Sequence, residues 1–570
     1  MRKIGFFISL ALASVFLVTS CTAKQGRFSE NADTAAAKQQ AELLGRLDYS
    51  VEQPDYNTTY EIFVYSFADS DGDGIGDING ITEKLDYIND GKAETADDLS
   101  ANAIWLTPIC PSTTYHKYDI TDYCDIDSEF GTLEDYKRLL SEAHKRGMKV
   151  IFDMVINHTS SEHPWFVSAG DYLRSHSGID LSDQKALEEA LKACPEIGYY
   201  NFLNEKKEGY AKLHGSDYYY EARFWEGMPD LNLDSEKVRE ELKEVVKFWL
   251  DLGVDGFRMD AVTSYHTGNT TKSVEALKWF CDMVRSIDPD TYIVSEAWTN
   301  QAEYAKYYES GIDSTFDFAF AGQSGVIANL ARGSEPASTY SKAIAAEEKL
   351  YGEESRKSGR ESFLNAPFYT NHDMNRSAGY YSGDNAKSLV KLSGALNLLM
   401  SGNAYVYYGE ELGMKGSGKD ENKRAPMAWS SAEEKNKDAM LCSGPSDMDQ
   451  TLEYTPYGTF ESEKKDADSV YAYYRDMMRL RYLFPVISRG KTEVIEELNS
   501  DKVAAFKKTD ESGKYQSVSV VINMSSEPEE VSLDDNILSA VLLTGQDAVL
   551  ENNGTYQLPP YAVAIFTQKQ

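Results

Sequence analysis

The sequence predicts an α/β fold, a (β/α)8 (TIM) barrel with a domain inserted after its third strand and an all-β sandwich domain at the C-terminus. From residue 60 onward, short apolar segments alternate with helical patterns, which is typical of parallel strands joined by crossover helices. Eight such segments occur before residue 410, as a barrel with insertions requires. The expected strands are Tyr60–Ala68, Ala103–Ile109, Lys149–Ile156, Val254–Asp260, Thr291–Trp298, Asp313–Phe320, Pro367–Asp373 and Ala404–Gly409.

Two of the crossover helices have recognisable ends. Thr132 is a suitable N-cap for the first helix, and Gly147 ends it just before a strand. Ser235 is a suitable N-cap for the second, and Gly253 ends it before the strand Val254–Asp260. Both segments therefore predict a helix that leads directly into a barrel strand.

Two stretches do not fit a simple barrel. The connection after the third strand is much longer than one crossover needs, and its first part, residues 159–228, is rich in aromatic residues. After residue 485 the pattern changes to short alternating runs separated by turn residues. We therefore expect a barrel of residues 49–158 and 229–484, an inserted domain of residues 159–228 and a β-sandwich of residues 485–570.

The N-terminus predicts export. Two basic residues precede an uncharged run, Ile4–Ser20, and Val18-Thr-Ser-Cys21 resembles a bacterial lipobox. Residues 1–20 are thus expected to be a lipoprotein signal peptide, with the lipid on Cys21 at the bacterial cell surface or the outer face of a membrane; the alternative is an uncleaved anchor. Residues 21–48 are polar and rich in Ala and Gln, which predicts a flexible tether.

Charge and cysteine content exclude several classes of protein. A net charge of -35 opposes binding to nucleic acid or to an anionic membrane surface.

The five cysteines after Cys21 show no metal-type spacing, and their odd number leaves at least one unpaired. Cys110 and Cys124 are able to pair, but we expect reduced, buried cysteines. The sequence gives no oligomeric signal, and a monomer is expected.

Polar residues gather at the C-terminal ends of the predicted strands, where barrel enzymes carry their catalytic groups. Arg258 and Asp260 share one face of a buried strand, an arrangement that in isolation would indicate a structural ion pair. Other strands also end in such groups: Asn157-His158, Glu296 and Asn371-His372-Asp373. The set suits either a carboxylate-bridged metal site or acid/base and nucleophilic chemistry on a sugar.

A separate acidic loop indicates a cation site. Asp69, Asp71, Asp73 and Asp77 occupy positions 1, 3, 5 and 9 of a calcium-loop pattern, and the carbonyl group of Ile75 is available at position 7. Position 12 is a glycine, so this is not an EF-hand, and a plain acidic turn is the alternative. Because oxygen ligands at this spacing suit Ca2+, we expect calcium at these five residues.

The chain contains, in this order, Asp153-Met-Val-Ile-Asn-His158, Gly256-Phe-Arg-Met-Asp260, Ser295-Glu-Ala-Trp298 and Thr370-Asn-His-Asp373. These four segments resemble the hallmark motifs of the alpha-amylase family of glycoside hydrolases, and the resemblance extends from about residue 55 to the C-terminus. It implies that Asp260 is the nucleophile, Glu296 the general acid and then base, and Asp373 the stabiliser of the transition state. Arg258 would keep Asp260 ionised, while His158, His372 and Tyr118 would contact the sugar.

Smaller features refine this expectation. Met228-Pro-Asp-Leu-Asn232 resembles a motif intermediate between the oligo-1,6-glucosidase and neopullulanase branches, and Ala261 resembles members that cleave α-1,4 bonds. Thr263-Ser264 departs from the Lys-His pair of many amylases, which leaves the leaving-group contacts open. Relatives also imply a second calcium site at Asn157 and Asp230.

Together these features predict a lipid-anchored, calcium-binding, retaining hydrolase of α-1,4-glucosidic bonds, with starch or maltooligosaccharides as its substrate. A cyclomaltodextrinase, neopullulanase or α-glucosidase of the same family is the alternative. A surface glucan-binding lipoprotein that has lost its chemistry is a third possibility, but the three carboxylates and Arg258 are all present.

Overall fold

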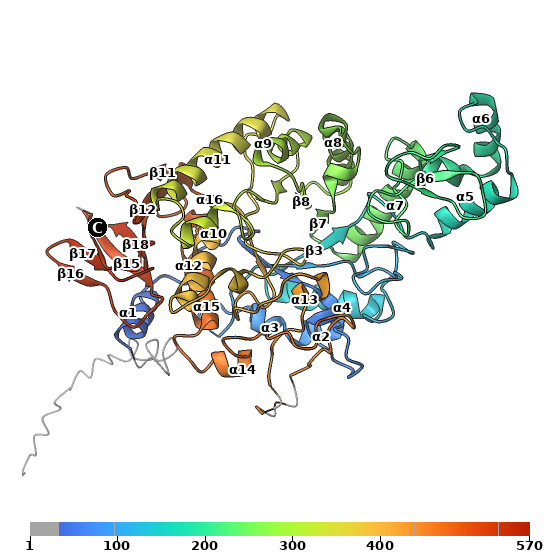
Figure 1. The fold of residues 1–570 in the computed structure, drawn as a ribbon. Coiled ribbons are helices and arrows are strands. Elements are labelled where there is room, and N and C mark those ends of the chain that lie inside the picture. Colours follow the sequence, from blue (N-terminus) through green and yellow to red (C-terminus); the bar gives the residue numbers. More distant parts are fainter. Residues whose placement is uncertain are drawn as a thin grey trace, which may run out of the picture.

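The computed structural model describes residues 34–95, 97–431, 433–434, 436, 439–533 and 535–569. The expected signal peptide and Cys21 lie outside these residues. Figure 1 shows an elongated molecule with the C-terminal sheets at one end, the inserted segment at the other and the parallel strands between them. Among the helices of the described residues, none combines the length and the apolar character needed to cross a membrane.

The centre of the molecule is a seven-stranded sheet whose paired strands all run parallel, in a TIM-like arrangement, in the order β10-β1-β2-β3-β7-β8-β9. Residues 366–368 connect its two edges, because Ala366 bridges to Phe316 beside β9 and Phe368 bridges to Tyr405 of β10. The strands are β1 Thr58–Ile62, β2 Ala103–Leu106, β3 Lys149–Met154, β7 Gly256–Met259, β8 Tyr292–Ser295, β9 Ser314–Thr315 and β10 Ala404–Tyr407.

The predicted strands are in the right order, but several are shorter than expected. The first ends at Ile62, because residues Val64–Ser66 turn into a 3-10 helix. The sixth keeps only two residues, and Pro367–Asp373 contributes one isolated bridge, at Phe368. In that segment the Asn371 side chain accepts the backbone N–H of Asp373 (3.0 Å), so the chain turns where a strand would continue.

Helices surround the sheet. A capping box formed by Thr132 and Asp135 begins α4, and Gly253 (φ 106°) ends α7 in the left-handed conformation that glycine favours. Ser235 is the N-cap of α7, but its side chain makes no capping hydrogen bond. The long helices here are α4 Leu133–Lys145, α7 Glu236–Leu252, α8 Thr270–Ile287, α11 Ser338–Lys357, α12 Ala386–Leu398 and α15 Val470–Leu483.

Short helices fill the connections between these elements. They are η1 Val64–Ser66, α2 Ile78–Glu83, α3 Leu85–Ile88, η3 Val262–Ser264, α9 Gln301–Tyr304, η4 Ala305–Ser310, α10 Val326–Ala331, η5 Ser377–Tyr380, α13 Asp420–Lys423, α14 Phe460–Glu463 and α16 Val486–Arg489.

The segment after β3 carries its own small antiparallel sheet, in the order β4-β6-β5. Aromatic packing holds it together: the Phe166 ring contacts the rings of Tyr200, Phe202 and Tyr220. Its elements are α5 Pro164–Ser175, α6 Gln184–Ala193, η2 Pro195–Tyr199, β4 Phe202–Leu203, β5 Tyr210–Lys212 and β6 Tyr219–Glu221.

The C-terminal part consists of two antiparallel sheets, β11-β12-β13-β18-β15 and β14-β17-β16. One hydrophobic cluster contains side chains from both, including Val521 and Phe566 of the larger sheet and Tyr556 of the smaller. The strands are β11 Lys491–Val494, β12 Val503–Thr509, β13 Val518–Asn523, β14 Glu529–Ser532, β15 Asn536–Leu542, β16 Leu550–Asn552, β17 Thr555–Leu558 and β18 Val563–Gln568.

Helix α1 (Ala35–Leu44) differs from the expected flexible tether. Gln39 bonds both to the carbonyl oxygen (3.0 Å) and to the N–H (2.8 Å) of Val549. Gln40 donates to Asp476 (2.6 Å) and accepts from the N–H of Leu543 (3.0 Å). These contacts, with the burial of Ala36 and Leu43 in the C-terminal core, order a segment whose composition indicates a linker.

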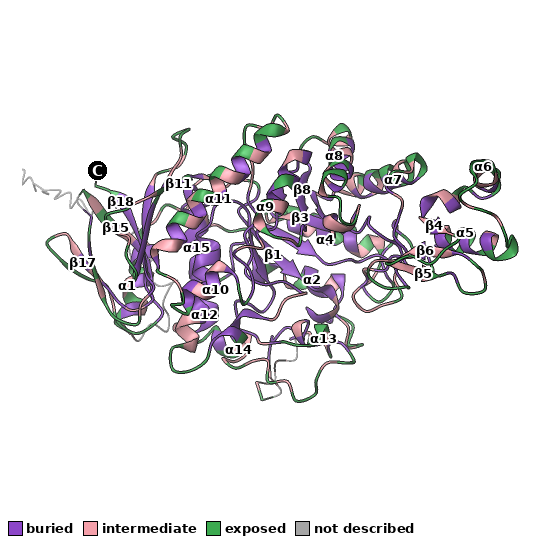
Figure 2. Cartoon of the chain, turned by 45° about the horizontal axis from the view of Figure 1, so that its top comes forward, coloured by how far each residue is buried: buried purple, intermediate pink, exposed green. Residues whose placement is uncertain are grey.

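Burial follows the same plan (Figure 2): the central strands and the inner faces of the helices are buried, and the outer helix faces and loops are exposed. All five described cysteines are unpaired; Cys110, Cys194 and Cys281 are buried as expected, whereas Cys124 and Cys442 are half-buried.

Candidate active site

Arg258 of β7 is the centre of the site, and its side chain is fully buried. Gly256 lies two residues earlier on the same face of this strand. It packs so closely against Tyr292 that a Cβ atom added at Gly256 would lie 2.7 Å from the Tyr292 carbonyl oxygen. The strand register places Arg258 beside Asp153 on β3. A guanidinium group at this position must find charged partners, because an unpaired buried charge is costly.

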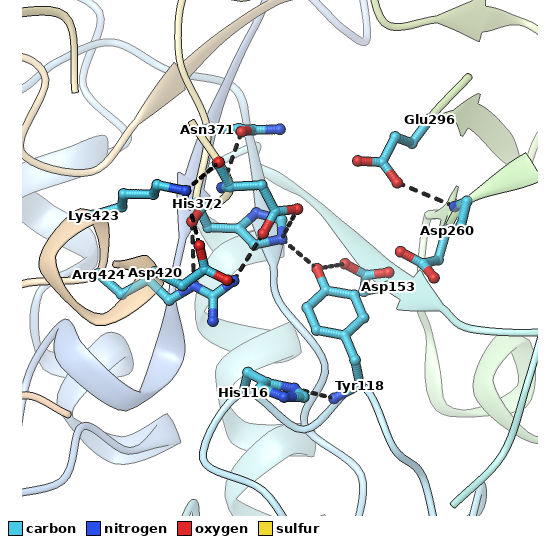
Figure 3. Close-up of polar contacts among 12 residues, drawn as sticks. His116, Tyr118, Asp153, Asp260, Glu296, Asn371, His372, Asp420, Lys423 and Arg424 are labelled. Atoms are coloured by element: carbon cyan, nitrogen blue, oxygen red, sulfur yellow. Dashed lines mark hydrogen bonds and ion pairs between the residues drawn. The ribbon is translucent and has the colours of Figure 1, made fainter. Parts of the chain in front are cut away.

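Three carboxyl groups surround this guanidinium. Nη1 donates to both oxygens of Asp153 (2.8 and 3.1 Å) and to Oδ1 of Asp260 (2.7 Å). Nη2 lies 3.0 Å from Oε2 of Glu296, although the geometry is too poor to count as a hydrogen bond. A single cation, Arg258, thus holds the two predicted catalytic carboxyl groups beside each other. Figure 3 shows Asp260 and Glu296 side by side.

The turn after Asp260 completes this half of the site. Ala261 has φ 45° and ψ 44°, a left-handed conformation that is uncommon for a residue with a side chain. In this conformation its N–H donates to Oε2 of Glu296 (3.1 Å). Unfavourable backbone conformations of this kind occur at functional sites, where surrounding contacts maintain them.

The charge balance favours a protonated Glu296. Burial raises its pKa, as do the charges of Asp260 and Asp373, and although Arg258 opposes them the pKa reaches about 8. Burial also raises the pKa of Asp153 to about 7. Yet Asp153 accepts from Arg258, Tyr118 (3.0 Å) and Trp105 (3.2 Å), and these donors favour its ionised form. Glu296 is therefore the group best suited to carry a proton.

Asp373 lies in a cationic environment across the site. Nη2 of Arg424 is 2.8 Å from Oδ1, and Nε2 of His372 is 3.2 Å from Oδ2. Burial raises the pKa of Asp373, but the charges of His372, Arg424 and Arg258 outweigh it and bring the pKa to about 2. Burial lowers the pKa of His372 itself to about 3, so the lasting positive charges beside Asp373 at neutral pH belong to the two arginines.

Tyr118 joins the two halves of the site (Figure 3). Its hydroxyl group lies 3.0 Å from Oδ2 of Asp153 and 2.8 Å from Nε2 of His372. Its ring is stacked on the His372 ring at a centroid distance of 5.5 Å. One connected network thus contains six of the seven predicted catalytic and sugar-binding residues: Tyr118, Arg258, Asp260, Glu296, His372 and Asp373.

The seventh, His158, is buried next to this network, and its Nδ1 atom lies 3.3 Å from the Asn157 side-chain nitrogen. Its Nε2 atom has no hydrogen-bond partner, and its ring lies 5.2 Å from that of Phe224. Because a buried, unpaired ring nitrogen is unfavourable, a ligand hydroxyl group is a suitable partner for it. Asn157 and Asp230, implied as a second calcium site, bond to each other (3.2 Å).

Three site residues were not predicted from the sequence to take part in the site. Asp153 interrupts the apolar strand Lys149–Met154, and such a buried acid was itself a detectable signal. Glu61 similarly lies in the buried strand β1 and contacts His372. Arg424 is distant in sequence, and no local pattern predicts that it contacts Asp373.

The acidic loop brings together three of the expected cation ligands. Oxygens of Asp69, Asp71 and Asp77 lie within 4.8 Å of one another, whereas Asp73 is outside this group. Asp69 and Asp77 are buried, and backbone N–H groups of the same loop donate to them. A set of hard oxygen donors fits a cation such as calcium, which would hold the loop without taking part in the reaction.

Comparisons with known proteins agree with this geometry. Residues 61–490 match the model of the alpha amylase catalytic domain. Alpha-amylase 3 of Dictyoglomus thermophilum is 36% identical over 521 residues, which cover 89% of this chain and 92% of the relative.

Two solved structures extend the similarity to the fold. Eubacterium rectale Amy13B has a TM-score of 0.85 and 43% identity, covering 93% of this chain and 99% of its own. The alpha-amylase from H. orenii has a TM-score of 0.74 and 33% identity, covering 90% and 100%. With a family match over most of its length and a barrel site built from clustered carboxyl groups, this chain belongs to the alpha-amylase family of glycoside hydrolases.

Proposed function

We propose that this α-glucan hydrolase cleaves α-1,4-glucosidic bonds in starch or maltooligosaccharides with retention of configuration. The observation that carries the proposal is the sharing of Arg258 among Asp153, Asp260 and Glu296. One cation cannot balance three carboxylates in a buried site, so one group remains protonated. An ionised carboxylate beside a protonated carboxyl group is the pair that double displacement needs.

In the first step, an oxygen of Asp260 attacks the anomeric carbon while Glu296 donates its proton to the glycosidic oxygen. The bond to the leaving sugar breaks as the glycosyl ester of Asp260 forms. In the second step, the Glu296 carboxylate takes a proton from water, and the water oxygen displaces Asp260 from the anomeric carbon. Two inversions give net retention, as expected for carboxyl groups about 5.5 Å apart.

The surrounding residues suit the sugar at the cleavage point. Asp373, ionised beside Arg424, would bind sugar hydroxyl groups and stabilise the positive charge of the transition state. Tyr118 would provide a stacking surface. His372 and the unpaired Nε2 atom of His158 would contact hydroxyl groups.

Three further assignments belong to this proposal. Cys21 would carry a lipid that holds the enzyme at a bacterial cell surface, and Asp69, Asp71 and Asp77 would bind Ca2+ as a structural ion. The enzyme would act as a monomer. The alternative within the family is a cyclomaltodextrinase, neopullulanase or α-glucosidase, which would use the same chemical step on a different substrate.

The test is the product profile from soluble starch, pullulan and a cyclodextrin, compared between wild type, Asp260→Asn and the control Asp251→Asn, an exposed position on α7. We expect short maltooligosaccharides from starch, little action on pullulan and loss of activity only in Asp260→Asn. Panose from pullulan, or faster opening of cyclodextrin, would assign the enzyme to the neopullulanase side. Glucan binding by a wild type that releases no products would refute the enzymatic proposal.

A further inference from the structure

Glu61 contacts the edge of the His372 ring opposite to the one that faces Tyr118. Its Oε1 lies 2.7 Å from Nδ1 and 3.3 Å from the backbone nitrogen of His372. Glu61 is only 1% exposed, and among the described residues no lysine or arginine lies within ion-pair distance of it. A buried carboxyl group without a cationic partner favours its neutral form.

The other edge of the ring shows where the His372 proton resides. Nε2 lies 2.8 Å from the Tyr118 hydroxyl group and 3.2 Å from Oδ2 of Asp373. Asp373 is held ionised by Arg424, so its oxygen only accepts hydrogen bonds. A lone pair on Nε2 would be repelled by this oxygen, and Nε2 must therefore carry the hydrogen.

A neutral imidazole has one N–H group, so a hydrogen on Nε2 leaves a lone pair on Nδ1. The 2.7 Å contact with Glu61 then requires that the hydrogen come from the glutamic acid. We propose that Glu61 is a positioning residue, a neutral carboxylic acid that donates to Nδ1 of His372 and so fixes Nε2–H as the donor that faces Asp373 and the substrate. This inference rests on the proposed function, because it concerns the same site.

The resulting hydrogen bonds all run in one direction. Glu61 donates to His372, Nε2 of His372 donates to the Tyr118 oxygen and to Asp373, and the Tyr118 hydroxyl group donates to Asp153. The reverse direction would deprive Asp153 of the Tyr118 donor and would turn a lone pair toward Asp373. Because Asp153 and Asp373 are both ionised and only accept hydrogen bonds, the arrangement in which Glu61 donates to His372 is favoured.

The surrounding charges agree with neutral partners. Burial raises the pKa of Glu61 well above its usual value; the backbone N–H of His372 and the charge of Arg258 oppose this, and Asp373 and Asp153 reinforce it. Burial lowers the pKa of His372 to about 3, further reduced by Arg424, Arg258 and His116 and opposed by Asp373. Trp105 and Tyr407, which pair with Glu61 in the neighbouring strands, bring no charge.

The direct test is the 15N spectrum of His372, identified by its loss in His372→Gln and measured near neutral pH in wild type, Glu61→Gln and Glu61→Leu. We expect the Nε2–H tautomer in wild type and in Glu61→Gln, because the glutamine amide can also donate to Nδ1, and a mixture of tautomers in Glu61→Leu. At high pH the wild type should lose this preference as Glu61 ionises, whereas Glu61→Gln should keep it. An imidazolium ring or an Nδ1–H tautomer in the wild type would overturn the proposal.

Kinetics provide a second measurement. We expect Glu61→Leu to lose about 100-fold in kcat, the scale of a misplaced contact, and Glu61→Gln to lose less than about tenfold.

The matched control is Glu410→Gln. Glu410 is another buried acid near the site, and it bonds Thr370 and Tyr474 but not His372. An equal effect of Glu410→Gln on the His372 spectrum would also refute the proposal. Circular dichroism checks folding, and a wild type with the expected tautomer but no glucan hydrolysis would refute the proposed function alone.

Discussion

Arg258 gives the two carboxyl groups beside it different hydrogen-bonding environments. Asp260 receives a direct hydrogen bond from Nη1, whereas Glu296 faces Nη2 in poor geometry and shares its Oε2 with the N–H of Ala261. A hydrogen bond to a carboxylate stabilises its ionised form, and only that form attacks, so the better-bonded group suits the proposed role of nucleophile. The proposed difference between nucleophile and acid thus follows from how one side chain divides its donors.

This division predicts an alkaline limit to activity. Since the pKa of Glu296 is raised to about 8, the rate kcat/KM should fall as pH rises through this value and the acid loses its proton. Glu296→Gln should lower kcat on starch by about 10²- to 10⁴-fold. The measurement is a pH profile on maltooligosaccharides.

The matched control is Glu275→Gln, at an exposed position of α8, which should retain the wild-type profile. An aryl glycoside whose leaving group needs no proton should show a weaker alkaline decline than starch in the wild type. A profile that stays flat across this range for both substrates would contradict the assignment of Glu296 as the acid.

At the level of single residues, the sequence predicted which groups gather at the site but not the side chains that hold them. Asp260, Glu296 and Asp373 each follow a predicted strand, and the structure brings them to one network. Arg424 lies far along the chain and reaches Asp373 only through tertiary folding. Local periodicity contains no information on such a contact.

Among the secondary elements, the loop Asp69–Asp77 gives the sharpest prediction. It begins after η1 and ends at Asp77, which caps α2. If calcium binds the group of Asp69, Asp71 and Asp77, a concentration 100 times Kd should raise the free energy of unfolding by about 2.7 kcal/mol. Thermal unfolding with calcium or with a chelator measures this gain, and calorimetric titration measures the binding itself.

Asp73→Asn offers a control within the same loop, since Asp73 lies outside the group of three. The calcium-dependent stabilisation should vanish in Asp69→Asn and persist in Asp73→Asn. If the calcium-dependent stabilisation were lost equally in both variants, Asp73 would also be a calcium ligand. The ligands would then match the sequence pattern and not only the group of Asp69, Asp71 and Asp77.

The lengths of elements were less predictable than their order. The expected strand Asp313–Phe320 retains two paired residues, because the backbone N–H of Phe318 already turns back to the Phe316 carbonyl group. An apolar run predicts burial equally well in a strand and in a buried turn. The composition of residues 21–48 likewise gave no indication of the partners that order α1.

For the whole molecule, several buried acids make stability depend on pH. Burial is the largest cause that raises the pKa of Glu410 and of Glu463 to about 7 and that of Glu296 to about 8. These groups bind protons more tightly in the folded than in the unfolded chain, so the stability they provide is lost as pH rises through those values. We expect a lower free energy of unfolding at pH 8.5 than at pH 5.5.

Urea unfolding at the two pH values measures this difference. Glu410→Gln should reduce it, because one pKa unit corresponds to about 1.4 kcal/mol, whereas Glu275→Gln should leave it unchanged. Asp373 acts in the opposite sense, but its pKa of about 2 confines its effect to strong acid. Greater stability at the higher pH would contradict the prediction.

The docking of α1 also limits how far one end of an anchored enzyme could lie from the lipid. The helix lies against the C-terminal sheets, at the end of the molecule away from the inserted segment (Figure 1). If Cys21 carries the lipid, only residues 22–34 separate it from this fixed point, a span of at most about 45 Å for an extended chain. The C-terminal sheets would then be held within this distance of the lipid surface, whereas the inserted segment, at the other end of the molecule, would be free to lie farther from it and to reach polysaccharide in the medium.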